Sequence, residues 1–169
     1  FPHLEEAIAA LKADGFRVSV DSFDPQELAR GTRAGADYLL SLNEHTLTIA
    51  EEGPAIPVLV PAQAGDLSSL VRAIEMCEVK GRPFLADPIL DPIHLGFTAS
   101  LVRYAELRRL KPDIPILMGI GNVTELTDAD TTGMNALLMG IISELRLNAV
   151  LAVQVSPHCP TAIREFDPA

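Results

Sequence analysis

Six short apolar segments, separated by segments with helical spacing, constrain the fold of this chain more than any other feature. The apolar segments cover residues 16–21, 37–43, 56–62, 83–87, 114–120 and 148–156. Each is apolar almost throughout rather than alternating between apolar and polar residues, which is typical of strands buried on both faces of a parallel sheet. The sequence therefore predicts an α/β protein with six parallel strands.

The segments between the strands carry helix signals. Apolar residues recur at three- and four-residue spacing at Leu4, Ile8 and Leu11, in residues 67–77 and in residues 137–145. Before one helix, Asp24 is a typical N-cap, Pro25 suits the first turn, and Glu27 is placed to complete a capping box. Three glycines, Gly15, Gly35 and Gly81, stand where helices are expected to end.

The polar residues at the strand ends help to choose between two α/β architectures. A polar side chain stands at or near the carboxyl end of every strand: Asp21, Asn43, Gln63, Asp87, Asn122 and Gln154. An open doubly wound sheet concentrates such residues at one switch point, whereas a (β/α)8 barrel places them on all strands. We therefore expect an incomplete (β/α)8 TIM-type barrel over residues 1–169, with two βα units missing, most simply before Phe1.

Composition excludes several classes of function. The 169 residues carry a formal net charge of -10, so no basic surface for nucleic acid is expected. No apolar run approaches the length of about 18 residues that a membrane span needs. The two cysteines, Cys77 and Cys159, are far apart, which favours a reduced, cytoplasmic setting. His158 and Cys159 are adjacent, which is not the spacing of a zinc site, and the residues predict no metal site.

Four strand-end residues are candidates for ligand binding. Asp21 and Asp87 end apolar strands, and a carboxylate there is costly to bury unless it is bonded to a ligand or to a neighbouring loop. Pro88 is expected to turn the chain directly after Asp87, which leaves the carboxylate at the carboxyl end of the strand. Asn43 and Asn122 offer both a donor and an acceptor, although asparagine is also a common turn residue.

Two further stretches are ambiguous. Gly119 and Gly121 relieve crowding where a strand meets a ligand, but the third glycine and the lysine of a phosphate-binding loop are absent.

After the last strand, Ser156 and His158 share one side of an extended segment and are candidate catalytic residues. The histidine is suited to acid–base chemistry or anion binding, and a loop-capping role is the alternative.

Three stretches together resemble the pterin-binding barrel family, which includes dihydropteroate synthases and methyltetrahydrofolate methyltransferases. They are "RVSVDSFDPQELARGTRAGADYLLSLN" at 17–43, "FLADPIL" at 84–90 and "GIGNVTELTDADTTGMNALLMGIISEL" at 119–145. The chain is most similar to the dihydropteroate synthase-like proteins found with tetrahydromethanopterin-dependent one-carbon metabolism. The resemblance covers nearly the whole chain and implies that its strands are the third to eighth of the barrel.

The resemblance also implies a ligand and a reaction. Asp21, Asn43, Asp87 and Asn122 would contact the pterin, and Gln63 and Gln154 are assigned to the same site. The expected reaction joins a pterin-methyl pyrophosphate to an arylamine in folate or tetrahydromethanopterin biosynthesis, with Mg²⁺ and a homodimer expected by analogy.

Two alternatives to this reaction stay open. One is a non-catalytic module that binds a reduced pterin, because Gly121-Asn122-Val123 and Gln154-Val155-Ser156 stand where synthases have Ser-Arg-Lys and Arg-x-His. The other is a pterin-dependent methyltransferase, in which Asn122 would hydrogen-bond a ring nitrogen.

Overall fold

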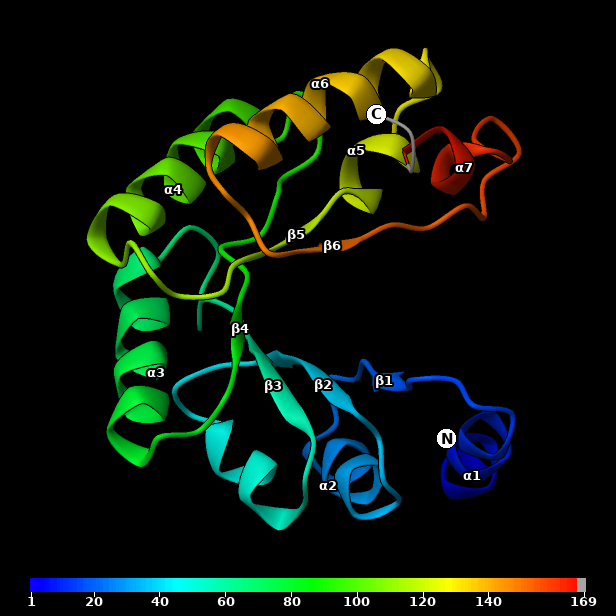
Figure 1. The fold of residues 1–169 in the computed structure, drawn as a ribbon, viewed down its shortest axis with the longest axis vertical. Helices are drawn as coiled ribbons and strands as arrows, with labels where there is room; N and C mark the ends of the chain where they lie inside the picture. The colour runs from blue at the N-terminus through cyan, green and yellow to red at the C-terminus, as the bar shows by residue number, and fades with distance from the viewer. Residues whose placement is uncertain (167–169) are drawn as a thin grey trace. The chain divides into compact units, whose positions relative to one another are not determined.

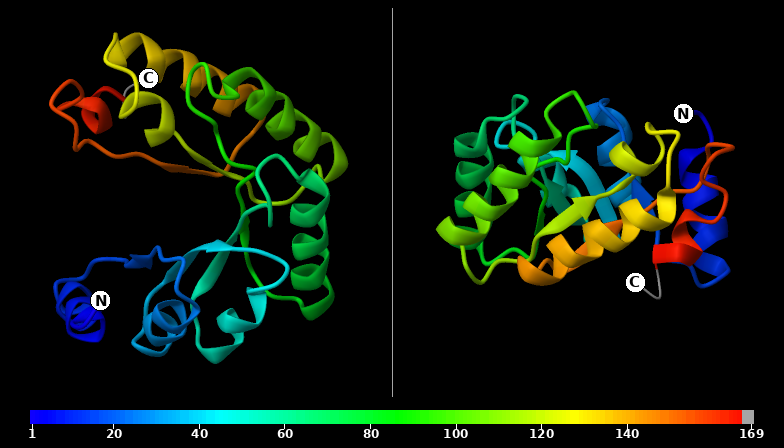
Figure 2. Two further views of the ribbon diagram at one scale, coloured as in Figure 1. Left: turned by 180° about the vertical axis from the view of Figure 1, so that it is seen from behind. Right: turned by 90° about the horizontal axis from the view of Figure 1, so that it is seen from above.

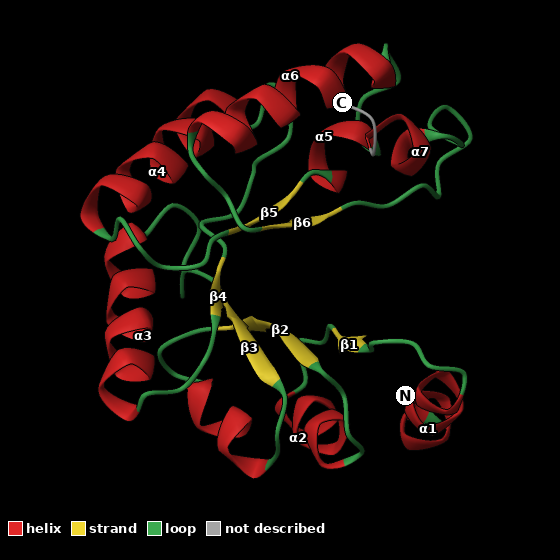
Figure 3. Cartoon of the chain, viewed as in Figure 1, coloured by secondary structure: helices red, strands yellow, loops and turns green. Residues whose placement is uncertain are grey.

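The computed structural model describes residues 1–166, in which helices and strands alternate along the chain (Figure 1, Figure 3). The chain divides into two compact units, Phe1–Ala86 and Asp87–Ala169. All six strands fall inside the six predicted apolar segments, and every strand pair is parallel. The prediction of an α/β fold with six parallel strands is confirmed.

The first unit contains a four-stranded parallel sheet. Its elements are α1 (Leu4–Ala13), β1 (Ser19–Val20), α2 (Pro25–Arg33), β2 (Tyr38–Leu42), the 3-10 helix η1 (Leu47–Glu52), β3 (Ile56–Leu59), α3 (Leu67–Lys80) and β4 (Leu85–Ala86). The strands lie in the order β1-β2-β3-β4, with Ser19 opposite Tyr38 and Val58 opposite Leu85. A sequential order is that of a barrel, because a doubly wound sheet reverses its order at a switch point.

The second unit contains a two-stranded parallel sheet and four helices among its described residues. Its elements are α4 (Phe97–Leu110), β5 (Leu117–Gly119), α5 (Gly121–Thr124), α6 (Thr131–Glu144), β6 (Ala149–Leu151) and α7 (Ala162–Phe166). Leu117 pairs with Ala149 and Gly119 with Leu151. Both α5 and α7 pack against α6 (Figure 1, Figure 2).

Each unit buries an apolar core of its own. Fully buried side chains in the first unit include Leu39, Leu42, Leu59, Leu70 and Ile74, and in the second unit Tyr104, Leu107, Ile116, Met118 and Ile120. The helical stripes are buried only in part: Leu11 is 43% and Leu137 63% exposed. The apolar spacing therefore predicted these helices correctly, but some residues of each apolar stripe are exposed.

The start of α2 shows how local sequence sets a helix end. Asp24 Oδ1 accepts a hydrogen bond from the Gln26 N–H at 2.8 Å, and Pro25 is the first helical residue. The predicted capping box is wrong in its second half. The Asp24 N–H donates to Ser22 Oγ at 3.0 Å, and that hydroxyl donates to Glu27 at 2.7 Å, so Ser22 stands between the two residues. The three glycines predicted to follow helices, Gly15, Gly35 and Gly81, all have positive φ.

Replacing the α2 cap should destabilise the protein modestly. Asp24→Ala leaves the Gln26 N–H without its partner, and we expect the free energy of unfolding to fall by about 1 kcal/mol. Urea unfolding followed by circular dichroism measures the change. Asp14→Ala is the control, because Asp14 is exposed and follows the carboxyl end of α1. Equal losses in the two variants would contradict the capping role.

Candidate functional site

In the first unit, Asp21 is held by an unusual residue of the neighbouring strand. Asp21 is exposed after β1, and its Oδ1 accepts a hydrogen bond from Ser41 Oγ at 3.0 Å. Ser41 has φ of 66° and lies in β2, where the register with β3 shifts between Leu39 and Leu42. A serine in left-handed backbone inside a strand is strained, and such residues cluster at functional sites. Asp21 therefore remains a ligand candidate, oriented by a residue that the sequence analysis missed.

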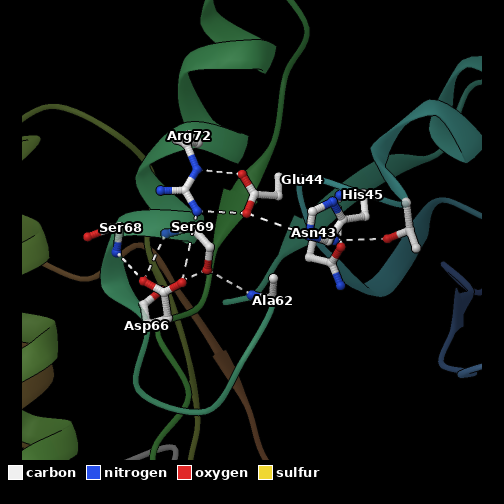
Figure 4. Close-up of polar contacts among 9 residues, drawn as sticks. Asn43, Glu44, His45, Ala62, Asp66, Ser68, Ser69 and Arg72 are labelled. Carbon is white, nitrogen blue, oxygen red and sulfur yellow. Dashed lines mark hydrogen bonds and ion pairs between the residues drawn. The ribbon is translucent and has the colours of Figure 1, made fainter.

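Asn43 forms a turn. Its Oδ1 accepts a hydrogen bond from the His45 N–H at 2.9 Å, while its own N–H donates to Thr46 Oγ1 at 3.0 Å (Figure 4). These contacts are those of an Asx turn at the end of β2. The amide nitrogen Nδ2 makes no hydrogen bond among the described residues and is left for a ligand, while Oδ1 already accepts one of its two possible hydrogen bonds.

The turn after Asn43 is braced by an ion pair. Arg72 on α3 donates to both carboxylate oxygens of Glu44, at 2.6 and 2.8 Å (Figure 4). This bidentate contact holds the pKa of Glu44 below its usual range.

Gln63 is exposed in the loop after β3. Ala62, next to it, donates through its N–H to Ser69 Oγ at 2.9 Å, and Asp66 caps α3 by accepting from the Ser68 and Ser69 N–H groups. Its neighbours fix the loop, while the Gln63 side chain itself faces solvent.

In the second unit, Asp87 is the most constrained of the predicted site residues. Its Oδ1 accepts two hydrogen bonds, from Tyr104 Oη at 2.6 Å and from the Ile89 N–H at 2.8 Å. Oδ2 has no hydrogen-bond partner among the described residues. Burial raises the pKa of Asp87 from its ordinary 3.8 to about 6, against the opposing effects of Tyr104, the Ile89 N–H and the charge of Arg103. A half-buried carboxylate with one free oxygen is equipped to accept a hydrogen bond from a ligand.

The loop after Asp87 is strained and firmly held. Ile89 has φ of 66°, which is rare for a β-branched residue. Arg103 on α4 donates to the Pro88 carbonyl at 3.2 Å, to the Ile89 carbonyl at 2.8 Å and to Asp91 Oδ2 at 2.7 Å. The Asp91 N–H donates to Ser100 Oγ at 3.1 Å. The segment thus contains one ligand candidate, Asp87, and one structural carboxylate, Asp91, and each of them is followed by a proline.

Asn122 is joined to the same loop. It lies in the short helix α5, directly after β5, and its Nδ2 donates to the Leu90 carbonyl at 2.8 Å. The side chain is otherwise exposed, so its Oδ1 is left as an acceptor. Asn122 and Asp87 are therefore linked through the segment 87–90, and both present free oxygen atoms.

The two glycines beside Asn122 have different roles. A Cβ on Gly121 would lie 2.6 Å from Val153 Cγ2, so any larger residue here would force the Val153 side chain to move. A Cβ on Gly119 would meet only Asp87 Oδ2, at 3.8 Å. Clearance for a ligand stays a prediction at Gly119, whereas Gly121 provides clearance for the Val153 side chain.

The segment after β6 is anchored to α5 and to the residue that follows it. Glu125 accepts hydrogen bonds from the Val155 and Ser156 N–H groups, each at 2.7 Å, and the Ser156 hydroxyl donates to the Glu125 carbonyl at 3.3 Å. Hydrogen bonding by Ser156 and Val155 lowers the pKa of Glu125 to about 2. His158 Nε2 lies 3.0 Å from the Thr124 carbonyl oxygen. Both candidate catalytic residues thus make loop-fixing contacts, and their catalytic assignment stays a prediction.

Gln154 lies apart from these contacts. It is exposed and lines a shallow pocket of about 440 Å³ together with Pro160, Thr161, Ile163, Arg164 and Phe166. Its assignment to a ligand site also stays a prediction.

Within residues 1–166, no three His, Cys, Asp or Glu side chains form a group that could hold a metal ion. None of the helices in this range is long and apolar enough to span a membrane. The Mg²⁺ expected by analogy stays a prediction, because Mg²⁺ is often held by one or two carboxylates together with substrate phosphates.

This chain is similar to a known protein in sequence and to solved structures in fold. No protein-family profile matches this sequence. An uncharacterized protein of Methanocaldococcus jannaschii is 30% identical over 167 aligned positions, which cover 88% of this chain and 32% of that protein. The chain thus spans about a third of the length of this relative.

Solved structures of dihydropteroate synthases superpose on nearly the whole chain. The Xanthomonas albilineans enzyme in complex with 7,8-dihydropteroate has a TM-score of 0.63 at 22% identity, covering 96% of this chain and 71% of that one. The Vibrio fischeri enzyme has a TM-score of 0.62 at 17% identity, covering 97% and 68%. The chain therefore has a dihydropteroate synthase-like α/β fold, an incomplete barrel of the TIM type, as the sequence predicted.

Four residues important to the candidate sites were missed by the sequence analysis. They are Ser41, Arg103, Tyr104 and Glu125, and each acts by contacting a residue 12 or more positions away. Tyr104 follows Asp87 by 17 positions and lies in a helix. From sequence, an aromatic residue in a helix is expected to be a core residue rather than a partner of a carboxylate. The carboxylate at the end of a buried strand was the only signal, because such a group requires a donor.

Proposed function

We propose that this protein is a pterin-binding protein that joins a pterin-methyl pyrophosphate to an arylamine. The observation that carries the proposal is the Asp87 carboxylate, which is half-buried at the end of β4, fixed through Oδ1 and free at Oδ2. Support also comes from the fold, which is that of the dihydropteroate synthases.

The chemistry of a pterin edge suits these acceptors. A pterin presents an exocyclic amino group and ring N–H groups beside a carbonyl. These donor groups are best matched by oxygen atoms that accept hydrogen bonds and carry no hydrogen of their own. Asp87 Oδ2 meets this need, and Asn122 Oδ1 offers a second acceptor because its Nδ2 is bonded to Leu90. Asp21, Asn43, Gln63 and Gln154 remain proposed pterin contacts, and Ser156 and His158 remain proposed catalytic residues.

The proposed reaction is a substitution at the exocyclic methylene of the pterin. The arylamine nitrogen forms the new C–N bond, the C–O bond to pyrophosphate breaks, and the nitrogen loses a proton. Catalysis would consist mainly of positioning the two substrates and of stabilising charge on the leaving group. A ribosylated arylamine of tetrahydromethanopterin synthesis and a homodimeric state belong to the same proposal, and no step is assigned to Mg²⁺.

A second candidate function is a module that holds a reduced pterin without reacting it. One observation favours it. The guanidinium of Arg103, which follows Asp87 in the same unit, already donates hydrogen bonds to the Pro88 and Ile89 carbonyls and to Asp91. The sequence also has Gly121-Asn122-Val123 and Gln154-Val155-Ser156 where synthases have cationic residues. Both observations leave the pyrophosphate without an evident cation.

Calorimetry with a 7,8-dihydropterin on the full chain tests the binding site. We expect the wild type to bind and Asp87→Ala to bind at least tenfold more weakly, since a hydrogen bond to a charged acceptor contributes about 1.5–3 kcal/mol. Asp113→Ala is the control, because Asp113 is exposed in the same unit. If wild type and Asp87→Ala bind equally weakly, the site assignment fails.

A second assay separates the enzyme from the module. Pyrophosphate release is measured with the pterin-methyl pyrophosphate, with and without an arylamine. Release that depends on the arylamine supports the enzyme, whereas tight pterin binding without release supports the module.

A further inference from the structure

Tyr104 is placed to control Asp87 from the interior of the second unit. Its side chain is fully buried on α4, and its hydroxyl donates to Asp87 Oδ1 at 2.6 Å. This separation is typical of a charge-assisted O–H···O⁻ hydrogen bond. Burial and the neighbouring Asp87 carboxylate raise the pKa of Tyr104 well above its usual value, so the hydroxyl stays a donor throughout the neutral range.

The two carboxylate oxygens of Asp87 differ in their contacts, because both of its hydrogen bonds are made by Oδ1. Tyr104 and the Ile89 N–H both donate to Oδ1, while Oδ2 makes no hydrogen bond among the described residues and lies 3.8 Å from the position that a Cβ on Gly119 would take. A ligand that approaches this carboxylate therefore meets a single acceptor atom of fixed direction. This difference depends on Tyr104, because it is the side chain that donates to the carboxylate.

The other charged groups near Asp87 are fixed elsewhere. Arg103 acts on Asp87 through its charge, but its guanidinium donates to Asp91 Oδ2 and to the Pro88 and Ile89 carbonyls. Asp91 affects Tyr104 through its charge. Arg103 and Asp91 are paired with each other, so the groups that hold the Asp87 carboxylate are the Ile89 N–H and the Tyr104 hydroxyl, of which only the hydroxyl belongs to a side chain.

We propose that Tyr104 is the positioning residue of the binding site: its hydroxyl fixes Oδ1 of Asp87 and so holds Oδ2 toward the N–H donors of the ligand. The proposal rests on the proposed function for the identity of the ligand. Without the hydroxyl, the half-buried carboxylate loses its strongest donor, binds its proton more tightly and is free to turn. Ligand binding should then require a higher pH.

Tyr104→Phe tests the proposal, because phenylalanine keeps the ring in the core and removes only the hydroxyl. The first readout is the Asp87 pKa in the ligand-free protein, measured by NMR of ¹³C-labelled carboxyl groups. The second is the affinity for a 7,8-dihydropterin between pH 5 and 9. We expect the Asp87 pKa to rise by about one unit, so that roughly half of the carboxylates are protonated at pH 7. Protonation alone should then lower the affinity at pH 7 about twofold, and this part should recover at pH 8.5, whereas the loss of orientation should lower the affinity at every pH.

The other tyrosine of the chain provides the control. Tyr38 lies in the first unit, where its hydroxyl is 3.4 Å from an Arg17 nitrogen, and Tyr38→Phe should change neither readout. A measurement in the unmutated fold complements the variants. With both tyrosines replaced by 3-fluorotyrosine, the ¹⁹F signal of Tyr104 should follow the titration of Asp87.

The outcomes distinguish this proposal from the proposed function. If Tyr104→Phe binds dihydropterin with the wild-type pH profile, the positioning role is overturned while the pterin function stands. An unchanged Asp87 titration, or a ¹⁹F signal from Tyr104 that ignores that titration, also overturns it. If the wild type binds no dihydropterin at any pH, the proposed function fails, and the ligand-free titrations still judge the control of Asp87 by Tyr104.

Discussion

Asp87→Asn is expected to weaken dihydropterin binding by roughly 10- to 100-fold while making the folded protein more stable at pH 7. The amide oxygen can still accept from Tyr104 and Ile89, so the local structure should persist. The amide nitrogen, however, replaces the free acceptor Oδ2 with a donor, which would face the donors of the ligand. Binding and stability should therefore change in opposite directions.

The stability gain follows from the pKa of Asp87. The folded protein holds this proton more tightly than the unfolded chain, because the pKa is about 6 when folded and 3.8 ordinarily. The carboxylate therefore costs nothing below pH 3.8, its cost grows as pH rises to about 6, and it is constant above that. The full difference corresponds to at most about 3 kcal/mol at 1.36 kcal/mol per unit, and we expect about 1–2 kcal/mol.

Urea unfolding at pH 4, 5 and 7 measures this effect. Asp87→Asn should be close to wild type at pH 4 and more stable at pH 7. Asp113→Asn, a change of the same type at an exposed position, should show no such pH-dependent gain. A stability difference between Asp87→Asn and wild type that is the same at pH 4 and pH 7 would show that Asp87 is not held at a raised pKa.

Arg108→Met should destabilise the second unit by about 3–5 kcal/mol. Arg108 is buried on α4, and its guanidinium donates to the Leu145 carbonyl at 2.9 Å, the Arg146 carbonyl at 2.8 Å, the Pro112 carbonyl at 2.8 Å and the Ile114 carbonyl at 2.9 Å. These acceptors lie just after α6 and between α4 and β5. Methionine fills a similar volume but leaves them without a donor.

The neighbouring residue on the same helix is a matched control. Arg109 is exposed and pairs with Glu106 one turn away, so Arg109→Met should change the free energy of unfolding by less than about 0.5 kcal/mol. Urea unfolding of the full chain gives both values. If Arg108→Met does not fold, Arg108→Lys keeps the charge and should retain only part of the stability. Equal losses for positions 108 and 109 would refute the bridging role of Arg108.

Arg82 in the first unit is used in a similar way. It follows α3, and its guanidinium donates to the carbonyls of Ala50, Gly53 and Ala55. In both units an arginine at or just after the end of a helix satisfies carbonyl groups of connecting segments. Such use of arginine cannot be read from sequence, because the carbonyl groups belong to segments separated from it by up to 38 positions.

The elements of the fold were predictable because their signals are local. Strands buried on both faces are apolar throughout, as in residues 56–62 and 114–120, and the α2 cap depends on neighbouring residues. Boundaries were less predictable: the segment 148–156 contains a strand of only three residues, Ala149–Leu151. The rest of that segment has no regular secondary structure and is held in part by Glu125.

The sequence by itself determined the α/β fold class, the parallel direction of the strands and the presence of a carboxylate or amide within four residues after each strand. Only the tertiary structure decided which of these groups are free to bind a ligand. Asn43 and Asn122 each use one atom of the amide locally, whereas Asp87 keeps Oδ2 free because Tyr104 and Ile89 both donate to Oδ1. The reason is physical: apolar periodicity and capping act over a few residues, but a buried carboxylate takes its donors from whichever segments the fold brings beside it.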